Sequence, residues 1–165
     1  MMLTDWLAGF YNLYEPRGWM NLVWGFLMLH LYSALHESGH ALMALLLGTR
    51  VTRFQTGTPV LGQFTAGGIL LQFGIFPGGS VSYAYADDAP RWKVVAAALA
   101  GPLFPVLISA PLFLTPVSPY FTHLFGLIVT TGTLLNLCPW MQGTDGQKIV
   151  MHLRLMARGQ KTLNV

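Results

Sequence analysis

The sequence has few charged residues for its length. Asp, Glu, Lys and Arg make up 9% of the 165 residues, whereas hydrophobic residues make up 53%. Soluble domains carry about 25% charged residues, so this composition excludes an ordinary soluble surface and predicts a lipid bilayer as the surroundings. The nine Lys and Arg form no dense basic run, which argues against nucleic acid as a partner.

Cysteine and glutamate are also scarce. Cys138 is the only cysteine, which excludes an internal disulfide and a cysteine-based zinc cluster, and we assign this thiol no role. Glutamate occurs only at positions 15 and 37. A metal site that needs a glutamate downstream of Glu37 is therefore excluded.

Two long apolar stretches dominate what is present. Residues 18–48 contain a single acid, Glu37, and no Lys or Arg, and as a helix they are long enough to cross a hydrocarbon core of about 30 Å. Residues 94–144 carry no formal charge, and prolines divide the region into predicted spans at 91–114 and 120–138. The sequence thus predicts an all-α polytopic membrane protein with a three-span core.

The rest of the chain is interpreted around these spans as one membrane-embedded domain. Glycine-rich residues 51–86 predict an interfacial or re-entrant β-hairpin region, because an open sheet in lipid would leave backbone groups unpaired. Residues 1–17 predict an interfacial segment and 145–159 an amphipathic helix. Eight of the nine cations follow the first span, so we expect a multi-pass protein with its N-terminus outside and its active site toward the cytoplasm.

The clearest chemical motif is His36-Glu37-Ser38-Gly39-His40, an H-E-x-x-H pattern. Positions i and i+4 share one helix face, so His36 and His40 can bind one zinc ion, with Glu37 as general base. Such groups in a spanning helix are costly and therefore functional candidates. The alternative is a polar patch that contacts a partner helix or lines a small cavity.

A catalytic zinc site normally needs a third protein ligand. The downstream candidates are Asp87, Asp88, His123, Asp145 and His152. His123 begins the third span near the opposite face, the two adjacent aspartates are ordinarily solvated, and His152 is possible but unanchored. Asp145 is the best candidate, because it follows the third span at its cytoplasmic end and flanking glycines let the chain fold back.

Two further motifs suggest a family. Asn136-Leu137-Cys138-Pro139, followed by Thr144-Asp145-Gly146, resembles the N-x-x-P and D-G signature of the site-2 protease family of intramembrane zinc metalloproteases. With the histidine motif, the resemblance covers about residues 18–150. It implies zinc held by His36, His40 and Asp145, Glu37 as general base, and substrate binding by Asn136. Thr144 stands where the family usually has leucine.

The expected function is hydrolysis of peptide bonds in a membrane-embedded substrate, a single-span protein or a peptide, as in regulated intramembrane proteolysis. Strands around residues 68–73 either pair with an extended substrate or only plug the cytoplasmic mouth. The alternative is a zinc-binding membrane adaptor or a degenerate family member without protease activity. A metal transporter is disfavoured, because residues 94–114 offer almost no polar groups.

Overall fold

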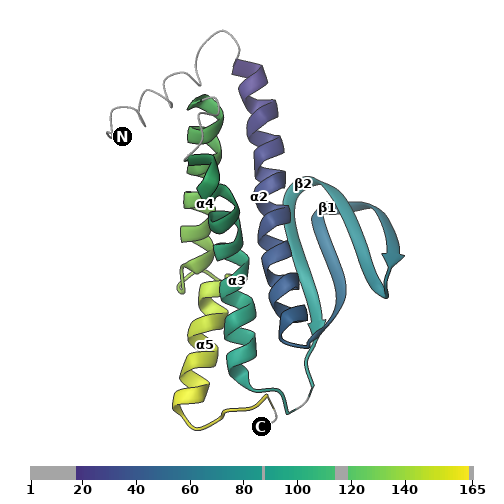
Figure 1. The fold of residues 1–165 in the computed structure, drawn as a ribbon, viewed down its shortest axis with the longest axis vertical. Coiled ribbons are helices and arrows are strands. Elements are labelled where there is room, and N and C mark those ends of the chain that lie inside the picture. Colours follow the sequence, from purple (N-terminus) through teal and green to yellow (C-terminus); the bar gives the residue numbers. More distant parts are fainter. Residues whose placement is uncertain (1–17, 87, 114–118, 164–165) are drawn as a thin grey trace.

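The computed structural model describes residues 18–86, 88–113 and 119–163, so the predicted segment 1–17 lies outside the described residues. The elements in chain order are α2 (Gly18–Leu46), β1 (Arg50–Ala66), β2 (Ile69–Ala84), α3 (Arg91–Ser109), the 3-10 helix η2 (Ala110–Phe113), α4 (Pro119–Leu137) and α5 (Asp145–Ala157). In Figure 1 helix α2 lies between a β-hairpin on one side and the helices α3, α4 and α5 on the other.

The helices pack through two different kinds of contact. α2 and α4 meet through a hydrophobic cluster of large side chains, Met28, Tyr32, Phe125 and Val129. α2 and α3 instead approach so closely that a Cβ on Gly39 would collide with the Ala100 carbonyl. Small residues at a helix crossing allow this close approach. The crossing brings the middle of α3 against the part of α2 that carries the histidine motif.

The β-hairpin folds back on itself. Arg53 of β1 pairs with both Ser82 and Leu70, and Thr56 pairs with both Gly79 and Phe73. Residues 53–56 therefore lie between residues 79–82 on one side and residues 70–73 on the other. The end of β2 forms the edge of the sheet that faces α2, where Gly79 contacts the Glu37 side chain.

The predicted fold class, an all-α protein with three spans, is wrong. The described residues contain a two-stranded antiparallel sheet with strands of 17 and 16 residues. Of these residues, only the helix Arg91–Ser109 is long and apolar enough to cross a membrane. α2 does not meet this criterion and carries the ionisable residues His30, His36, Glu37 and His40, and the apolar part of α4, Phe121–Leu137, is shorter.

The surface of the helices is nevertheless apolar. Leu22 of α2, Leu107 of α3 and Leu134 of α4 are 76%, 68% and 66% exposed. Together with the apolar helix Arg91–Ser109, such side chains fit association with a membrane. The predicted orientation, with the N-terminus outside and the active site toward the cytoplasm, assumed three spans. Because the described residues contain one candidate span, this orientation has no support.

Candidate metal centre

α2 buries all three ionisable residues of the H-E-x-x-H motif. His36, Glu37 and His40 are each less than 9% exposed. One helical turn separates the two histidines, and their rings lie 4.7 Å apart between centroids. Buried ionisable side chains need partners, because desolvation disfavours charge and leaves lone pairs unsatisfied. The partner comes from the far end of the chain.

That partner, Asp145, is the first residue of α5. The Thr144 side chain caps this helix by accepting a hydrogen bond from the Gln147 backbone N–H. Gly146 lets the start of α5 pack on the Leu137 carbonyl, where a Cβ would collide. Thr144, which stands where leucine was expected, thus helps to hold Asp145 in place. Gly146 permits the close turn from α4 into α5.

Three ligand atoms converge at this point with nearly equal spacing. His36 Nε2 lies 3.1 Å from His40 Nε2, and each nitrogen lies 3.1 Å from Asp145 Oδ2. Ligand atoms in a tetrahedral site with bonds of about 2.0–2.1 Å lie about 3.3–3.4 Å apart. The three atoms therefore match one face of such a site to within a few tenths of an ångström. They are the only His, Cys, Asp or Glu group of this kind in the described part of the chain.

A hydrogen bond fixes the tautomer of His40. Its Nδ1 lies 2.7 Å from the Ala97 carbonyl, which can only accept, so Nδ1 carries the proton. The neutral ring therefore turns the Nε2 lone pair toward His36 and Asp145. A lone pair and a carboxylate oxygen at 3.1 Å repel each other unless a cation or a proton lies between them. This donor set fits a metal ion, and the bond to Ala97 is the outer contact typical of a metal-binding histidine.

His36 lacks the corresponding support. Its Nδ1 is buried and has no hydrogen-bond partner among the described residues. The ring instead packs against Tyr32, with centroids 5.9 Å apart. The two histidines of the motif are therefore held differently, one by a backbone carbonyl of α3 and the other by packing within α2.

The charge state of Asp145 suits a metal ligand. Burial opposes ionisation of this carboxyl, but its interactions with the His36 and His40 rings outweigh burial, and the positive charge of Lys148 adds to them, so the pKa of Asp145 lies well below the usual value. Lys148 Nζ donates to Asp145 Oδ1 at 3.2 Å. The second carboxylate oxygen is thus engaged, which leaves Oδ2 directed at the histidines.

A cavity of about 250 Å³ opens beside these atoms. Glu37 and the end of β2 line it, including residues that the sequence did not single out, Gly79 and Tyr83. Burial raises the pKa of Tyr83, and the negative charges of Asp145 and Glu37 raise it further, so its hydroxyl stays a hydrogen-bond donor. The sequence predicted a strand in this region, but it could not show that the edge of this strand lies against α2. Gly79 and Tyr83 were therefore not predicted as site residues.

Asn136 of α4 also lines the cavity. Its amide nitrogen donates to the Gly132 carbonyl at 3.1 Å and to the Tyr32 hydroxyl at 3.4 Å. Because a carbonyl can only accept, the atom beside Gly132 must be the nitrogen. Both N–H bonds are therefore used within the protein, and the group left for a ligand is the carbonyl oxygen, an acceptor.

The other candidate ligands lie elsewhere or outside the description. Asp88 is exposed in the turn before α3, and His123 is half-buried on α4. His152 is buried on α5, where desolvation lowers its pKa and the charge of Arg91 lowers it further. Asp87 is not among the described residues.

Comparison with known proteins matches residues 24–119 to the model of peptidase family M50. This range includes the histidine motif and covers more than half of the chain, although Asn136 and Asp145 follow it. No curated protein matches the sequence. The match confirms the family that the motifs suggested. The chain therefore belongs to peptidase family M50, the site-2 protease family, whose members are intramembrane zinc metalloproteases.

Proposed function

We propose that this protein is a zinc endopeptidase of the site-2 type that hydrolyses peptide bonds of membrane-embedded protein substrates. The observation that carries the proposal is the convergence of His36 Nε2, His40 Nε2 and Asp145 Oδ2 at 3.1 Å from one another. Membership of a metalloprotease family supports it. In this proposal the three side chains would hold a zinc ion beside the cavity.

When bound, zinc supplies Lewis-acid polarisation of the scissile carbonyl and of the attacking water. The chain's own residues supply position and proton transfer. Glu37 follows His36 directly and lines the cavity, so its carboxylate can accept a proton from the attacking water and pass it to the leaving amine. Gly79 leaves room for this side chain, because a Cβ there would collide with it.

The end of β2 has a free edge at which a substrate peptide could bind in an extended conformation. Residues 79–84 pair with β1 on one side only within the described chain, and Gly79, Ser80, Val81 and Tyr83 line the cavity. A peptide added at this edge would place its carbonyls beside Glu37. Residues 70–73, around which the sequence suggested such pairing, have strand partners on both sides and offer no free edge.

Asn136 fits the same arrangement. Its free carbonyl oxygen can accept a hydrogen bond from a substrate backbone N–H, while β2 pairs with the other edge of the peptide. Two polar contacts on opposite edges would hold one peptide bond in register with Glu37. Orientation of this kind accounts for a large share of the rate that enzymes achieve.

The test compares wild type with Glu37→Gln, using purified protein, a single-span substrate in vesicles, and metal analysis of the same samples. Glu37→Gln removes the general base but none of the three ligands. We expect about one zinc ion per chain in both proteins and a loss of cleavage of about 10²–10⁴-fold in the variant.

Asp88→Asn is the matched control, because it removes an exposed carboxylate outside the cavity. It should cleave at the wild-type rate. Full cleavage by Glu37→Gln would exclude Glu37 as the base. A wild-type protein that holds zinc but cleaves no substrate would indicate the alternative, a zinc-binding membrane adaptor.

A further inference from the structure

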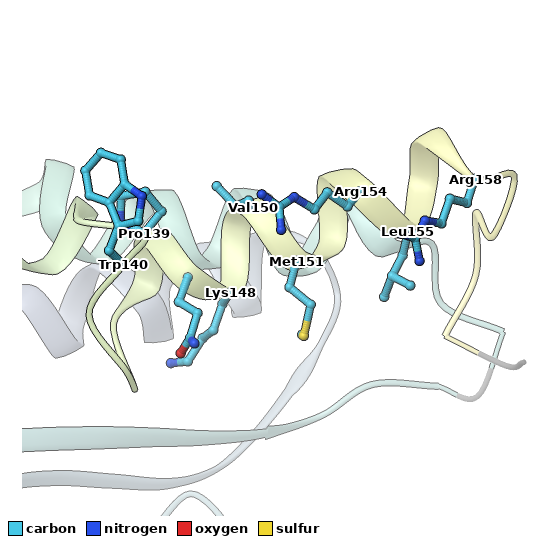
Figure 2. Close-up of a pocket in the computed structure, with 9 residues that line it drawn as sticks. Pro139, Trp140, Lys148, Val150, Met151, Arg154, Leu155 and Arg158 are labelled. Carbon is cyan, nitrogen blue, oxygen red and sulfur yellow. The ribbon is translucent and has the colours of Figure 1, made fainter.

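An open groove of about 800 Å³ runs along α5. Figure 2 shows Pro139 and Trp140 at one end, Leu155 and Arg158 at the other, and Val150, Met151 and Arg154 between them. The opposite side of α5 packs on α3, with Ile149 and His152 buried. The helix is therefore amphipathic, but part of its exposed face is apolar.

The charge of the groove has one sign. The groove is lined by three cationic residues, Lys148, Arg154 and Arg158. None of the described residues that line it is acidic. Lys148 is partly neutralised by Asp145, with which it forms a salt bridge of 3.2 Å. The other salt bridges in the described chain involve neither arginine. Within the described residues, the exposed guanidinium groups of Arg154 and Arg158 therefore have no salt-bridge partner.

The apolar residues of the groove have an unusual exposure. Trp140 is 87% exposed, and Met151 is 49% exposed one turn before Arg154. A tryptophan and apolar side chains beside Arg and Lys are typical of helices that lie in the headgroup region of a membrane. Neither a free phosphate nor an acidic peptide needs an exposed tryptophan beside the cations.

We propose that the groove of α5 binds anionic phospholipid headgroups, with Arg154 and Arg158 contacting the phosphate and Trp140 the acyl-chain boundary. The surface is separate from the metal centre apart from Lys148, which lines both cavities. Binding would hold α5, and with it Asp145 at the start of the helix, beside the membrane surface. The proposal does not depend on protease activity.

Native mass spectrometry of the purified full chain in non-ionic detergent tests this proposal. The protein is titrated with phosphatidylglycerol or with phosphatidylcholine of the same acyl chains. Each Lys or Arg near an anionic surface contributes about fivefold in affinity. We expect wild type to prefer phosphatidylglycerol at least fivefold, and Arg154→Gln/Arg158→Gln to abolish this preference while binding phosphatidylcholine as before.

The matched control is Arg50→Gln/Lys161→Gln, which removes two exposed cations outside the groove. It should keep the preference for phosphatidylglycerol. Thermal unfolding of both double variants verifies that they fold. The proposal is overturned if wild type shows no preference, if Arg154→Gln/Arg158→Gln keeps it, or if both double variants lose it equally.

Two competitors separate the lipid from other anions. Inorganic phosphate should not displace phosphatidylglycerol at equal concentration, and a glutamate-rich peptide should bind less tightly than the lipid. Displacement by phosphate would mean a site for a free anion. Tighter binding of the peptide, lost in Arg154→Gln/Arg158→Gln, would mean a protein partner. Either result would overturn the proposal.

Discussion

Two glycine-rich regions of this molecule differ in what their glycines do. We call them the metal corner, where α2, α3, β2 and the start of α5 meet, and the outer hairpin, residues 60–70. In the metal corner, a Cβ on Gly101 would collide with the His40 ring, and one on Gly146 would collide with the Leu137 carbonyl. In the outer hairpin, a Cβ on Gly62 would meet no atom within 4 Å.

The comparison separates two physical reasons for glycine. In the metal corner, glycine is required because the His40 ring or a backbone carbonyl occupies the space that a Cβ would need. In the outer hairpin, Gly67 and Gly68 have φ angles of +57° and +79°, so they are required by the backbone of the turn, while Gly62 has neither constraint. The three predictions below sharpen this contrast, from the largest expected effect to the smallest.

Removal of a ligand should have the largest effect. Asp145→Ala deletes one of the three converging atoms, and we expect zinc content to fall from about one ion per chain to near zero after dialysis. Metal analysis of the purified protein measures this. Asp88→Ala, which removes an exposed carboxylate, should keep its zinc. Equal zinc in wild type and Asp145→Ala would show that the metal corner does not bind the ion through this residue.

A methyl group in the metal corner should have the next largest effect. Gly101→Ala forces the His40 ring out of place, and overpacking of this kind typically costs about 1–3 kcal/mol. We expect a lower melting temperature and weaker zinc binding. The matched control is Gly25→Ala, since this helical glycine has open space around it. If Gly101→Ala behaves like Gly25→Ala, the packing of α3 against His40 is not what positions the ring.

The smallest effect is expected in the outer hairpin. Gly62→Ala adds a methyl group where nothing is displaced and the φ angle is ordinary. Surface substitutions of this kind usually change the free energy of unfolding by less than about 0.5 kcal/mol. Thermal unfolding and cleavage should both match wild type. A loss of activity would mean that the outer hairpin contacts the substrate, contrary to the role assigned here to residues 79–83.

Much of the architecture was predictable from local patterns. The apolar run 18–48 contains helix α2, and the glycine-rich segment after it contains the hairpin, because hydrophobic runs and turn residues act over short distances. The all-α three-span class was not correct. Spans were inferred from apolar length, but among the described residues only Arg91–Ser109 meets the length and hydropathy of a span, and the hairpin forms an extensive sheet by satisfying its own backbone.

The sequence predicted which residues form the candidate site, but not the contacts that hold those residues in position. The spacing of His36 and His40 places them on one helix face wherever the helix lies. Sequence could not show that the Ala97 carbonyl fixes the tautomer of His40, or that the end of β2 lies over Glu37. These contacts join elements far apart in the chain, and local propensity carries no information about them.

The sequence by itself determined the chemistry of this protein: two imidazoles and a carboxylate on one helix, a family motif downstream, and too little charge for an ordinary soluble surface. Only the tertiary structure decided that Asp145 meets both histidines at 3.1 Å, and which strand edge borders the cavity. The physical reason is that residue types and spacing act within one turn or strand. Convergence across more than a hundred residues depends on how the helices pack.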